Sequence, residues 1–315
     1  MNDTAQISNA LLSRLSTPPV TPLTSREFWN LASTTPLSEL PGQSEDALSE
    51  RFGIRPDIAT RIPALLGRGR ALALAMEEFE HSGFWVIAGD DERYPTRLRE
   101  RLRDAAPAIL YGVGNQALLD VDGLGVVGSR DIPHESIEVA QAVAGVAAGH
   151  GIPVVSGGAR GVDQQAMSAA FESGGTVVGV LADSLLRAAS SASTRHAIAE
   201  ERVCLVTPYA PSAPFSAGNA MGRNKIIYGL SRGVVVVRSD KDSGGTWAGA
   251  AEALSKHYSI VHTWLGAGAG PGNQPLVALG ALPLASSDDL ASKLLAESVL
   301  APSQKSRESA PLTLF

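Results

Sequence analysis

Residues 126–163, VVGSRDIPHESIEVAQAVAGVAAGHGIPVVSGGARGVD, contain two short apolar runs, each of which leads into a turn of Gly, Ser and Arg. Between the two turns lies a stretch with apolar residues at helical spacing. Strand, helix and strand in this order predict a βαβ unit, whose strands are parallel and whose turns lie at the same edge of the sheet. The stretch therefore predicts an α/β fold with a candidate binding site at the carboxyl edge of its sheet.

The rest of the chain after residue 84 repeats this pattern. Runs such as FWVIAGD, TVVGVLAD and GVVVVRSD are apolar at nearly every position, which is typical of strands buried on both faces. Amphipathic stretches such as DQQAMSAAFESG and GTWAGAAEALSKH separate them. We therefore predict an extended Rossmann-like domain over residues 84–300, with a doubly wound, mostly parallel sheet.

The region before this domain has a different character. Residues 1–24 are rich in Ser, Thr and Pro and lack a periodic apolar pattern, so a flexible leader is expected. Residues 25–83 read as short helices and predict a small all-α module of the SAM-like or helix-hairpin-helix-like kind. Its Gly-centred turns at residues 40–42 and 66–70 either hold a phosphate or serve only as tight turns. The polar residues 301–315 predict a flexible tail.

The composition narrows the classes of protein. The chain has 315 residues, 44% of them hydrophobic, with 26 Lys and Arg against 32 Asp and Glu. A formal net charge of −6 argues against coating of duplex nucleic acid over the whole surface. The single cysteine, Cys204, excludes an intrachain disulfide, and no His or Cys pattern predicts a metal site. Without an apolar run of membrane length or a secretory leader, a cytoplasmic protein is expected.

Four turns between a predicted strand and the following helix share small residues and cations. Backbone N–H groups at a helix start attract anions, and Arg presents a planar fork that matches phosphate oxygens. Neither of the first two turns has the Walker A or GxGxxG pattern, which disfavours ATP hydrolysis and dinucleotide redox chemistry, and no cofactor is expected. We predict one extended phosphate-binding rim, formed by Gly128, Ser129, Arg130, Ser156, Gly157, Gly158, Arg160, Gly161, Arg223, Asn224, Lys225, Lys241, Ser243, Gly244, Gly245 and Thr246.

Several of these residues also have a purely structural interpretation. Arg130 and Arg160 can each form an ion pair with a neighbour such as Asp131 or Asp163. Asp163 can act as a general base beside the phosphate site, but a carboxylate at the start of the following helix explains it at least as well. The cations of the turns contrast with glutamates on the helices, so the pattern predicts that charge is sorted by position although the domain is nearly neutral.

The order and spacing of these motifs resemble the DNA-processing protein A (DprA/Smf) family. The resemblance runs from about residue 26 to about residue 290 and includes VGSR, SGGARGVD, GGTVVGVLA, GRNKIIYGLS and SGGT, of which SGGARGVD is the most specific. It implies a single-stranded DNA-binding protein that protects DNA, helps to load the RecA recombinase during transformation or recombination, and forms a homodimer. By the same resemblance, Arg130, Arg160 and Arg223 fall on the family's basic positions.

The chain departs from the family pattern in several places. It has Arg223-Asn224-Lys225 where the family has Arg-Asn-Arg, which keeps the charge but loses one bidentate donor. Leu-Arg-Ala at residues 186–188 replaces the family's Tyr-Pro, so the pocket between neighbouring loops is altered. Too few residues follow residue 290 for the winged-helix module that such proteins often carry.

Three functions are compatible with these observations. The favoured one is a single-strand binder without catalytic residues. The second is a nucleotide phosphoribohydrolase of the Lonely-Guy type, which needs a carboxylate one helical turn after Gly-Thr. Here Thr246 is followed three residues later by Gly249, and the first acid, Glu252, lies one turn further along. The third is a sensor of a nucleotide-derived ligand, for instance in a defence system.

Overall fold

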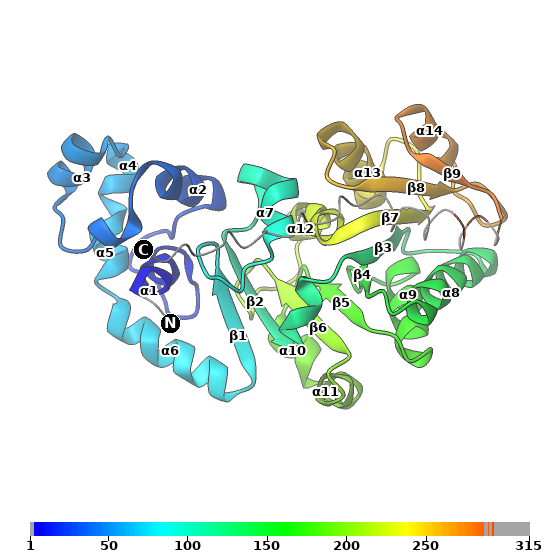
Figure 1. Cartoon of the computed structure of the whole chain (residues 1–315), viewed down its shortest axis with the longest axis horizontal. Coiled ribbons are helices and arrows are strands. Elements are labelled where there is room, and N and C mark those ends of the chain that lie inside the picture. Colours follow the sequence, from blue (N-terminus) through cyan, green and yellow to red (C-terminus); the bar gives the residue numbers. More distant parts are fainter. Residues whose placement is uncertain (1–2, 287–288, 290–291, 293–315) are drawn as a thin grey trace, which may run out of the picture.

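A computed structural model describes residues 3–286, 289 and 292 of the chain. The predicted tail over residues 301–315 and the end of the predicted sheet domain lie outside this part. At the centre is a nine-stranded sheet in the order β1-β2-β6-β5-β4-β3-β7-β8-β9 (Figure 1). Its strands are β1 (Phe84–Ala88), β2 (Ile109–Gly114), β3 (Gly123–Gly128), β4 (Val154–Ser156), β5 (Val177–Val180), β6 (Val203–Thr207), β7 (Ser231–Arg238), β8 (Ile260–Trp264) and β9 (Leu282–Leu284).

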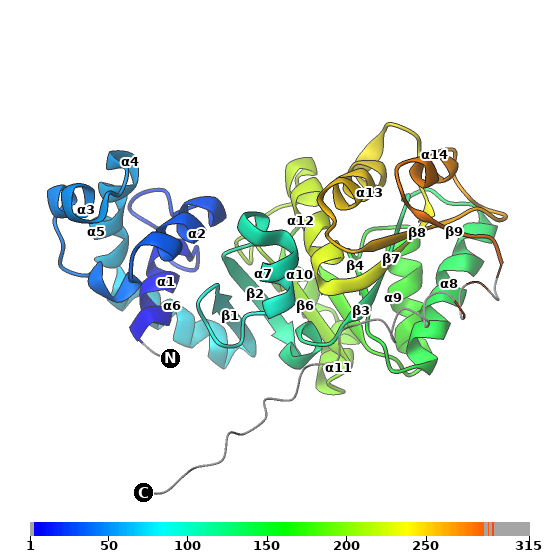
Figure 2. The same ribbon diagram turned by 45° about the horizontal axis from the view of Figure 1, so that its top comes forward.

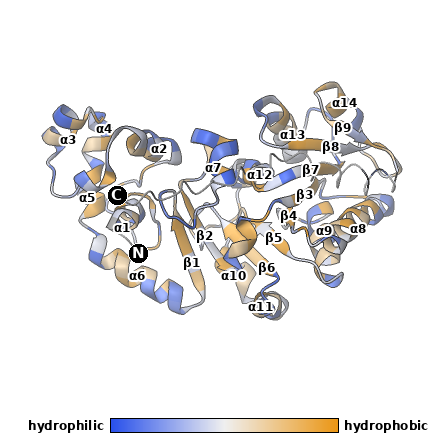
Figure 3. Ribbon diagram, viewed as in Figure 1, coloured by the Kyte–Doolittle hydropathy of each residue, from blue (hydrophilic) through white to orange (hydrophobic). Residues whose placement is uncertain are grey.

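The pairing of the strands confirms the predicted doubly wound, mostly parallel α/β fold. The pairs β1–β2 and β2–β6 are antiparallel, and the six other neighbouring pairs are parallel. The central strands are apolar because helices cover both of their faces: residues 234–237 of β7 are all fully buried. Figure 3 shows the hydrophobic strands β1 and β8 and the mostly hydrophilic α7.

Helices cover both faces of this sheet. In Figures 1 and 2, α8 and α9 lie on one face, whereas α12 and α13 lie on the other. None of the helices in the described residues is both long and apolar enough to span a membrane. The helices of this part are α7 (Thr96–Leu102), α8 (His134–Gly149), α9 (Val162–Glu172), α10 (Leu185–Ser190), α11 (Ala192–Ala199), α12 (Ala217–Leu230), α13 (Gly244–Lys256) and α14 (Asn273–Ala278), with short 3-10 turns at Arg103–Ala105 and Gln116–Leu119.

A helical module lies beside β1 and β2 at one end of the sheet (Figure 1). The stacked rings of Phe79 and Phe84 join its last helix to β1, and the indole of Trp29 donates to the carbonyl oxygen of Ala106 at 2.8 Å. The helices are α1 (Asp3–Leu12), α2 (Ser25–Thr34), α3 (Glu45–Phe52), α4 (Pro56–Ala59), α5 (Arg61–Leu66) and α6 (Gly69–His81), with a 3-10 turn at Leu37–Glu39.

In place of the flexible leader expected over residues 1–24, the structure has α1. Its apolar side chains are buried, and its last carbonyl groups receive hydrogen bonds from the buried guanidinium of Arg68. This group donates to the carbonyl oxygens of Ala10 and Ser13, both at 2.7 Å. A partner more than fifty residues away along the chain therefore stabilises the end of α1. The same hydrogen bonds occupy the side chain of Arg68, which lies in one of the two turns considered for phosphate binding.

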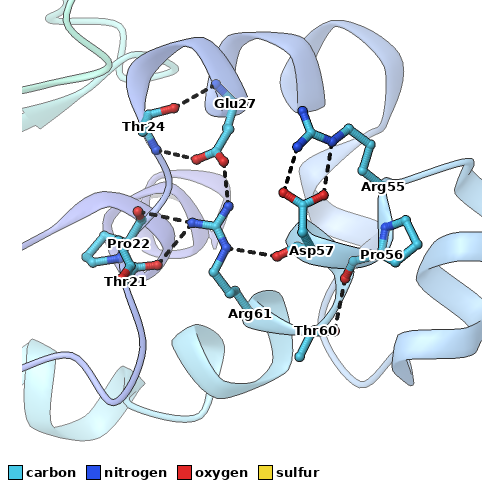
Figure 4. A network of polar contacts seen from close by, with 9 residues as sticks. All are labelled: Thr21, Pro22, Thr24, Glu27, Arg55, Pro56, Asp57, Thr60 and Arg61. Atoms are coloured by element: carbon cyan, nitrogen blue, oxygen red, sulfur yellow. Dashed lines mark hydrogen bonds and ion pairs between the residues drawn. The ribbon is translucent and has the colours of Figure 1, made fainter.

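A polar network orients the start of α2 (Figure 4). Thr24 and Glu27 form a capping box, in which the Thr24 N–H donates to the Glu27 carboxylate at 2.7 Å. Arg61 donates to the same carboxylate at 2.6 Å and to the carbonyl oxygens of Thr21 and Asp57. Burial acts to raise the pKa of Glu27, but the hydrogen bonds from Thr24 and Arg61 outweigh it, so the pKa is lowered.

We expect Arg61→Ala to lower the free energy of unfolding by about 2 kcal/mol at neutral pH, because Glu27 loses a charge-assisted hydrogen bond. Since the pKa of Glu27 is lowered in the folded protein, its contribution is present above the unfolded-state pKa and is lost as pH falls through the folded-state pKa. The difference between wild type and variant should therefore shrink in acid. Urea denaturation at pH 7 and below about pH 4 measures both effects.

The matched control is Arg55→Ala, because Arg55 pairs with Asp57 in the same network but both side chains are mostly exposed. Exposed ion pairs contribute little to stability. Equal losses for Arg61→Ala and Arg55→Ala would contradict the assigned role of Arg61.

Candidate nucleic-acid interface

The doubly wound sheet reverses its strand order between β3 and β7. From β3 the chain moves outward through β4, β5 and β6, and from β7 it moves the other way through β8 and β9. Ligands of such sheets bind outside the carboxyl ends of the strands at this point. A cleft of about 760 Å³ lies there, with walls from the turns after β3 and β7, from α12 and from the first turn of α13.

The turn after β3 supplies Gly128, Ser129 and Arg130 to the cleft. The N–H and hydroxyl of Ser129 both donate to the carbonyl oxygen of Arg238, at 2.9 and 3.2 Å, so Ser129 joins this turn to β7. Arg130 is exposed, and its guanidinium carbon lies 5.3 Å from the ring centroid of Phe215. Among the described residues its side chain has no hydrogen bond or ion pair. Arg130 is therefore available to a ligand.

A buried carboxylate organises the loop after β4. Asp163 lies in the first turn of α9, is 5% exposed, and accepts a hydrogen bond from the Gly157 N–H at 3.2 Å. The N–H groups of Ala159 and Gly128 also bond to it. Burial raises the pKa of this carboxyl, and the nearby Arg223 opposes the shift. Because Asp163 ties the loop after β4 to the end of β3, its structural interpretation is favoured over a role as general base.

The prediction that Arg223, Asn224 and Lys225 lie in a turn between a strand and a helix is wrong, because α12 already begins at Ala217. The Ser216 hydroxyl caps it by accepting the Asn219 N–H at 3.0 Å. Arg223 is consequently buried in the middle of α12 instead of standing on a rim, and it donates to the carbonyl oxygen of Val180 at 2.5 Å. An added Cβ at Gly157 would lie 1.6 Å from the same guanidinium nitrogen, so Gly157 makes room for Arg223.

Glycines at positions 218 and 222 favour a turn in isolation, since Gly is a poor helix former. A Cβ at Gly222 would lie 2.7 Å from the hydroxyl of Tyr209. That hydroxyl donates to the carbonyl oxygen of Asn219 at 2.9 Å. Packing of the Tyr209 side chain against α12 thus accounts for a glycine inside this helix.

The predicted rim residues divide between the cleft and its surroundings. Arg160 forms an ion pair with Asp131 at 2.6 Å, and both side chains are exposed, so the ion-pair alternative holds for Arg160 but not for Arg130. The predicted residues that line the cleft are Gly128, Ser129, Arg130, Arg223, Asn224, Ser243, Gly244, Gly245 and Thr246. Those outside its lining are Ser156, Gly157, Gly158, Arg160, Gly161, Lys225 and Lys241.

The cleft also has apolar and acidic residues that the predicted rim lacked. Phe215 and Met221, at 52% and 55% exposure, belong to its lining together with Trp247. Four aspartates also line it: Asp131, Asp163, Asp240 and Asp242. The predicted sorting of charge is therefore wrong at this position, because Asp131, Asp240 and Asp242 stand in the same turns as the cations. The aspartates could be recognised in the turn sequences, whereas the position of Met221 in the cleft follows from the early start of α12.

Together, the fold and the cleft define a doubly wound protein with two guanidinium groups, Arg130 and Arg223, at its switch point. The chain belongs to the DNA recombination-mediator protein A family, whose model matches residues 85–295. This finding confirms the family resemblance of the motifs.

Individual relatives agree with this assignment. The DNA processing protein DprA of Streptococcus pneumoniae is 32% identical over 157 residues, which are 49% of this chain and 54% of that protein. A DprA-type protein of Mycobacterium tuberculosis is 28% identical over 253 residues, 75% of this chain and 65% of that protein. The chain thus spans about half to two thirds of these relatives.

Two solved structures share the fold. The X-ray structure of DNA processing protein A from Streptococcus pneumoniae has a TM-score of 0.62 at 25% identity and covers 87% of this chain and 98% of that chain. DNA processing protein A from Helicobacter pylori, solved to examine its single-stranded DNA binding mode, has a TM-score of 0.55 at 21% identity and covers 68% of this chain and 96% of that chain.

Proposed function

We propose that this protein binds single-stranded DNA in and beside the cleft and catalyses no reaction on it. The observation that carries the proposal is Arg130, an exposed guanidinium at the carboxyl end of β3 that contacts the exposed ring of Phe215. Phosphate contacts from Arg and stacking of bases on aromatic rings are the two components of single-strand binding with little sequence preference. Family membership supports the same conclusion.

The electrostatics of the cleft floor favour an anion. Burial lowers the pKa of Arg223; the charge of Asp163 opposes this shift, and the positive charge of Arg130 adds to it. Two guanidinium groups near each other repel, and a phosphate between them would relieve that repulsion. On the β7 side, Asp240 and Asp242 repel phosphates, whereas on the β3 side Asp131 is paired with Arg160. We therefore place the DNA backbone along the side of the cleft formed by β3 and α12.

The alternative functions are less well supported. A phosphoribohydrolase of this type needs a carboxylate one helical turn after Gly-Thr. The first acid after Thr246 is Glu252, whose carboxylate accepts a hydrogen bond from the Tyr258 hydroxyl at 3.0 Å and does not belong to the cleft lining. A sensor of a nucleotide-derived ligand would use the same cleft. It differs from a strand binder in that mononucleotides would bind as tightly as oligonucleotides.

We further propose a homodimer that helps to load RecA in the cytoplasm, on the basis of family membership. Three large apolar side chains support dimerisation at the β9 end of the sheet: Ile260, Leu279 and Leu282 are 41%, 51% and 44% exposed. A second copy would cover these side chains. Light scattering at tens of micromolar tests this, with Leu282→Lys as the variant expected to remain monomeric. RecA filament formation on coated single strands tests the loading.

We expect the affinity for single-stranded DNA to fall with salt. About four phosphate contacts per protomer predict a slope of roughly −3 in a plot of log affinity against log salt, at about −0.7 per contact for single strands. Fluorescence anisotropy with labelled oligonucleotides, competed by duplex DNA and by mononucleotides, measures this. Salt-independent binding, a preference for duplex or equal competition by mononucleotides would contradict the proposal.

A further inference from the structure

We propose that a second nucleotide subsite lies across α12 from the cleft, in a hollow between the sheet and the helical module. It would extend the path of a bound single strand toward α2. This inference rests on the proposed function and adds a site that binds phosphate and base at a distance from the switch point.

The hollow opens at the same edge of the sheet as the cleft. It has a volume of about 470 Å³ and is lined by the start of α2, the segment before β2, the turn after β6 and α12. The strand β6 is parallel to β5 and, through β4, to β3. The carboxyl end of β6 therefore lies at the edge where β3 and β7 end. A strand of DNA that leaves the cleft along this edge meets the hollow next.

The side chains of the hollow have the chemistry of a phosphate and base site. Arg26 and Lys225 line it, and within the part of the chain that the structure describes neither side chain has an ion pair or hydrogen bond. The one acid of the lining, Asp104, lies 3.5 Å from Arg99. The side chain of Tyr209 also lines the hollow, and its hydrogen bond to Asn219 holds it in place. Two unpaired cations beside an aromatic ring repeat the combination of Arg130 and Phe215.

The cleft and the hollow are continuous along the chain. The connection from β6 to α12 carries Tyr209 near one end, in the hollow, and Phe215 near the other, in the cleft. On α12 itself, Asn224 lines the cleft and the next residue, Lys225, lines the hollow. Consecutive residues of a helix point about 100° apart, so α12 presents one side to each site. A strand that crosses α12 would contact both.

The network in Figure 4 prepares the hollow for a ligand. Arg26 lies between Thr24 and Glu27, whose capping box sets the start of α2, and Arg61 anchors Glu27 to the rest of the module. The Glu27 and Arg61 side chains are only 19% and 17% exposed, so the contact is partly shielded from solvent. The backbone that carries Arg26 is therefore ordered without DNA, which lowers the entropy cost of binding.

The test is the dependence of affinity on oligonucleotide length. Oligothymidylates of about 4 to 16 nucleotides are titrated against the whole protein, its Arg26→Ala/Lys225→Ala variant and its Arg130→Ala variant. A control variant, Arg195→Ala/Lys256→Ala, removes the same charge from exposed positions outside both sites. Thermal unfolding verifies that each variant is folded.

We expect wild-type affinity to rise with length until the strand crosses α12. Arg26→Ala/Lys225→Ala should lose about tenfold or more of that rise, the size of one charge-assisted contact, whereas the control should keep it. Arg130→Ala should lose affinity at every length. If the double variant keeps the full rise while Arg130→Ala loses binding, the second subsite is wrong and the cleft stands. If wild type binds no length, the proposed function is wrong, and the subsite with it.

Discussion

Replacement of Arg130 by Ala is expected to weaken single-stranded DNA binding by about 1.5 to 3 kcal/mol, or roughly ten- to a hundredfold in Kd. The guanidinium is exposed, is unpaired in the described part of the molecule, and lies over the ring of Phe215, so a phosphate gains two donors from it. Losing that contact should also make the salt slope shallower by about 0.7. Anisotropy titrations at several salt concentrations measure both changes.

Folding stability should barely change in Arg130→Ala, because no protein group in the described residues loses a hydrogen bond. Arg130→Lys should restore part of the affinity, since Lys keeps the charge but cannot hold two phosphate oxygens in one plane. Equal affinity of wild type and Arg130→Ala at low salt would remove the turn after β3 from the DNA site.

The ion pair of Arg160 with Asp131 requires a separate test, because the sequence assigned Arg130 and Arg160 equal roles. Arg160→Ala is expected to weaken binding less than Arg130→Ala does. The loss should arise because the negative charge of Asp131, which lines the cleft, is left uncompensated. If so, Asp131→Ala in the same chain restores the affinity. If the double variant stays as weak as Arg160→Ala, Arg160 holds a phosphate directly.

The largest effect on stability is expected for Gly161→Ala. Gly161 has φ 89° and ψ −133°, a conformation that side chains rarely adopt, and an added Cβ would lie 2.4 Å from the carbonyl oxygen of Ser129 and 2.5 Å from that of Arg130. Backbone strain of about 1 to 3 kcal/mol and overpacking of similar size should together lower the free energy of unfolding by about 4 kcal/mol. Displacement of the Arg130 backbone should also reduce DNA affinity. Urea denaturation and anisotropy on one preparation measure the two losses.

Gly158→Ala is the matched control in the same loop. Gly158 also has a positive φ, 65°, but the nearest atom to an added Cβ is Leu181 Cδ2 at 3.6 Å, an ordinary contact. Gly158→Ala should lower the free energy of unfolding by only about 1 kcal/mol, because the side chain has to adopt a left-handed backbone conformation. Equal stability losses at the two glycines would show that the close approach of Gly161 to the turn after β3 does not contribute to the loss in Gly161→Ala.

Local pattern determined much of this fold. Runs such as residues 234–237 are apolar at every position, and only a strand covered on both faces buries them all. The Gly-rich turns after β3 and β4 follow such runs directly, so their place at the carboxyl edge could be predicted from strand direction alone. The family resemblance had the same origin, because its motifs are these turns.

Tertiary contacts decided the remainder. The helix α1 needs Arg68 for its last carbonyl groups, and the early start of α12 comes with Tyr209 packed against Gly222; both partners are distant along the chain. For the same reason, sequence could not show that Arg160 is paired with Asp131, whereas Arg130 has no ion pair or hydrogen bond within the described part of the chain. Local sequence determines which conformations a segment prefers, but the partner of a charged side chain depends on which loops the sheet brings together.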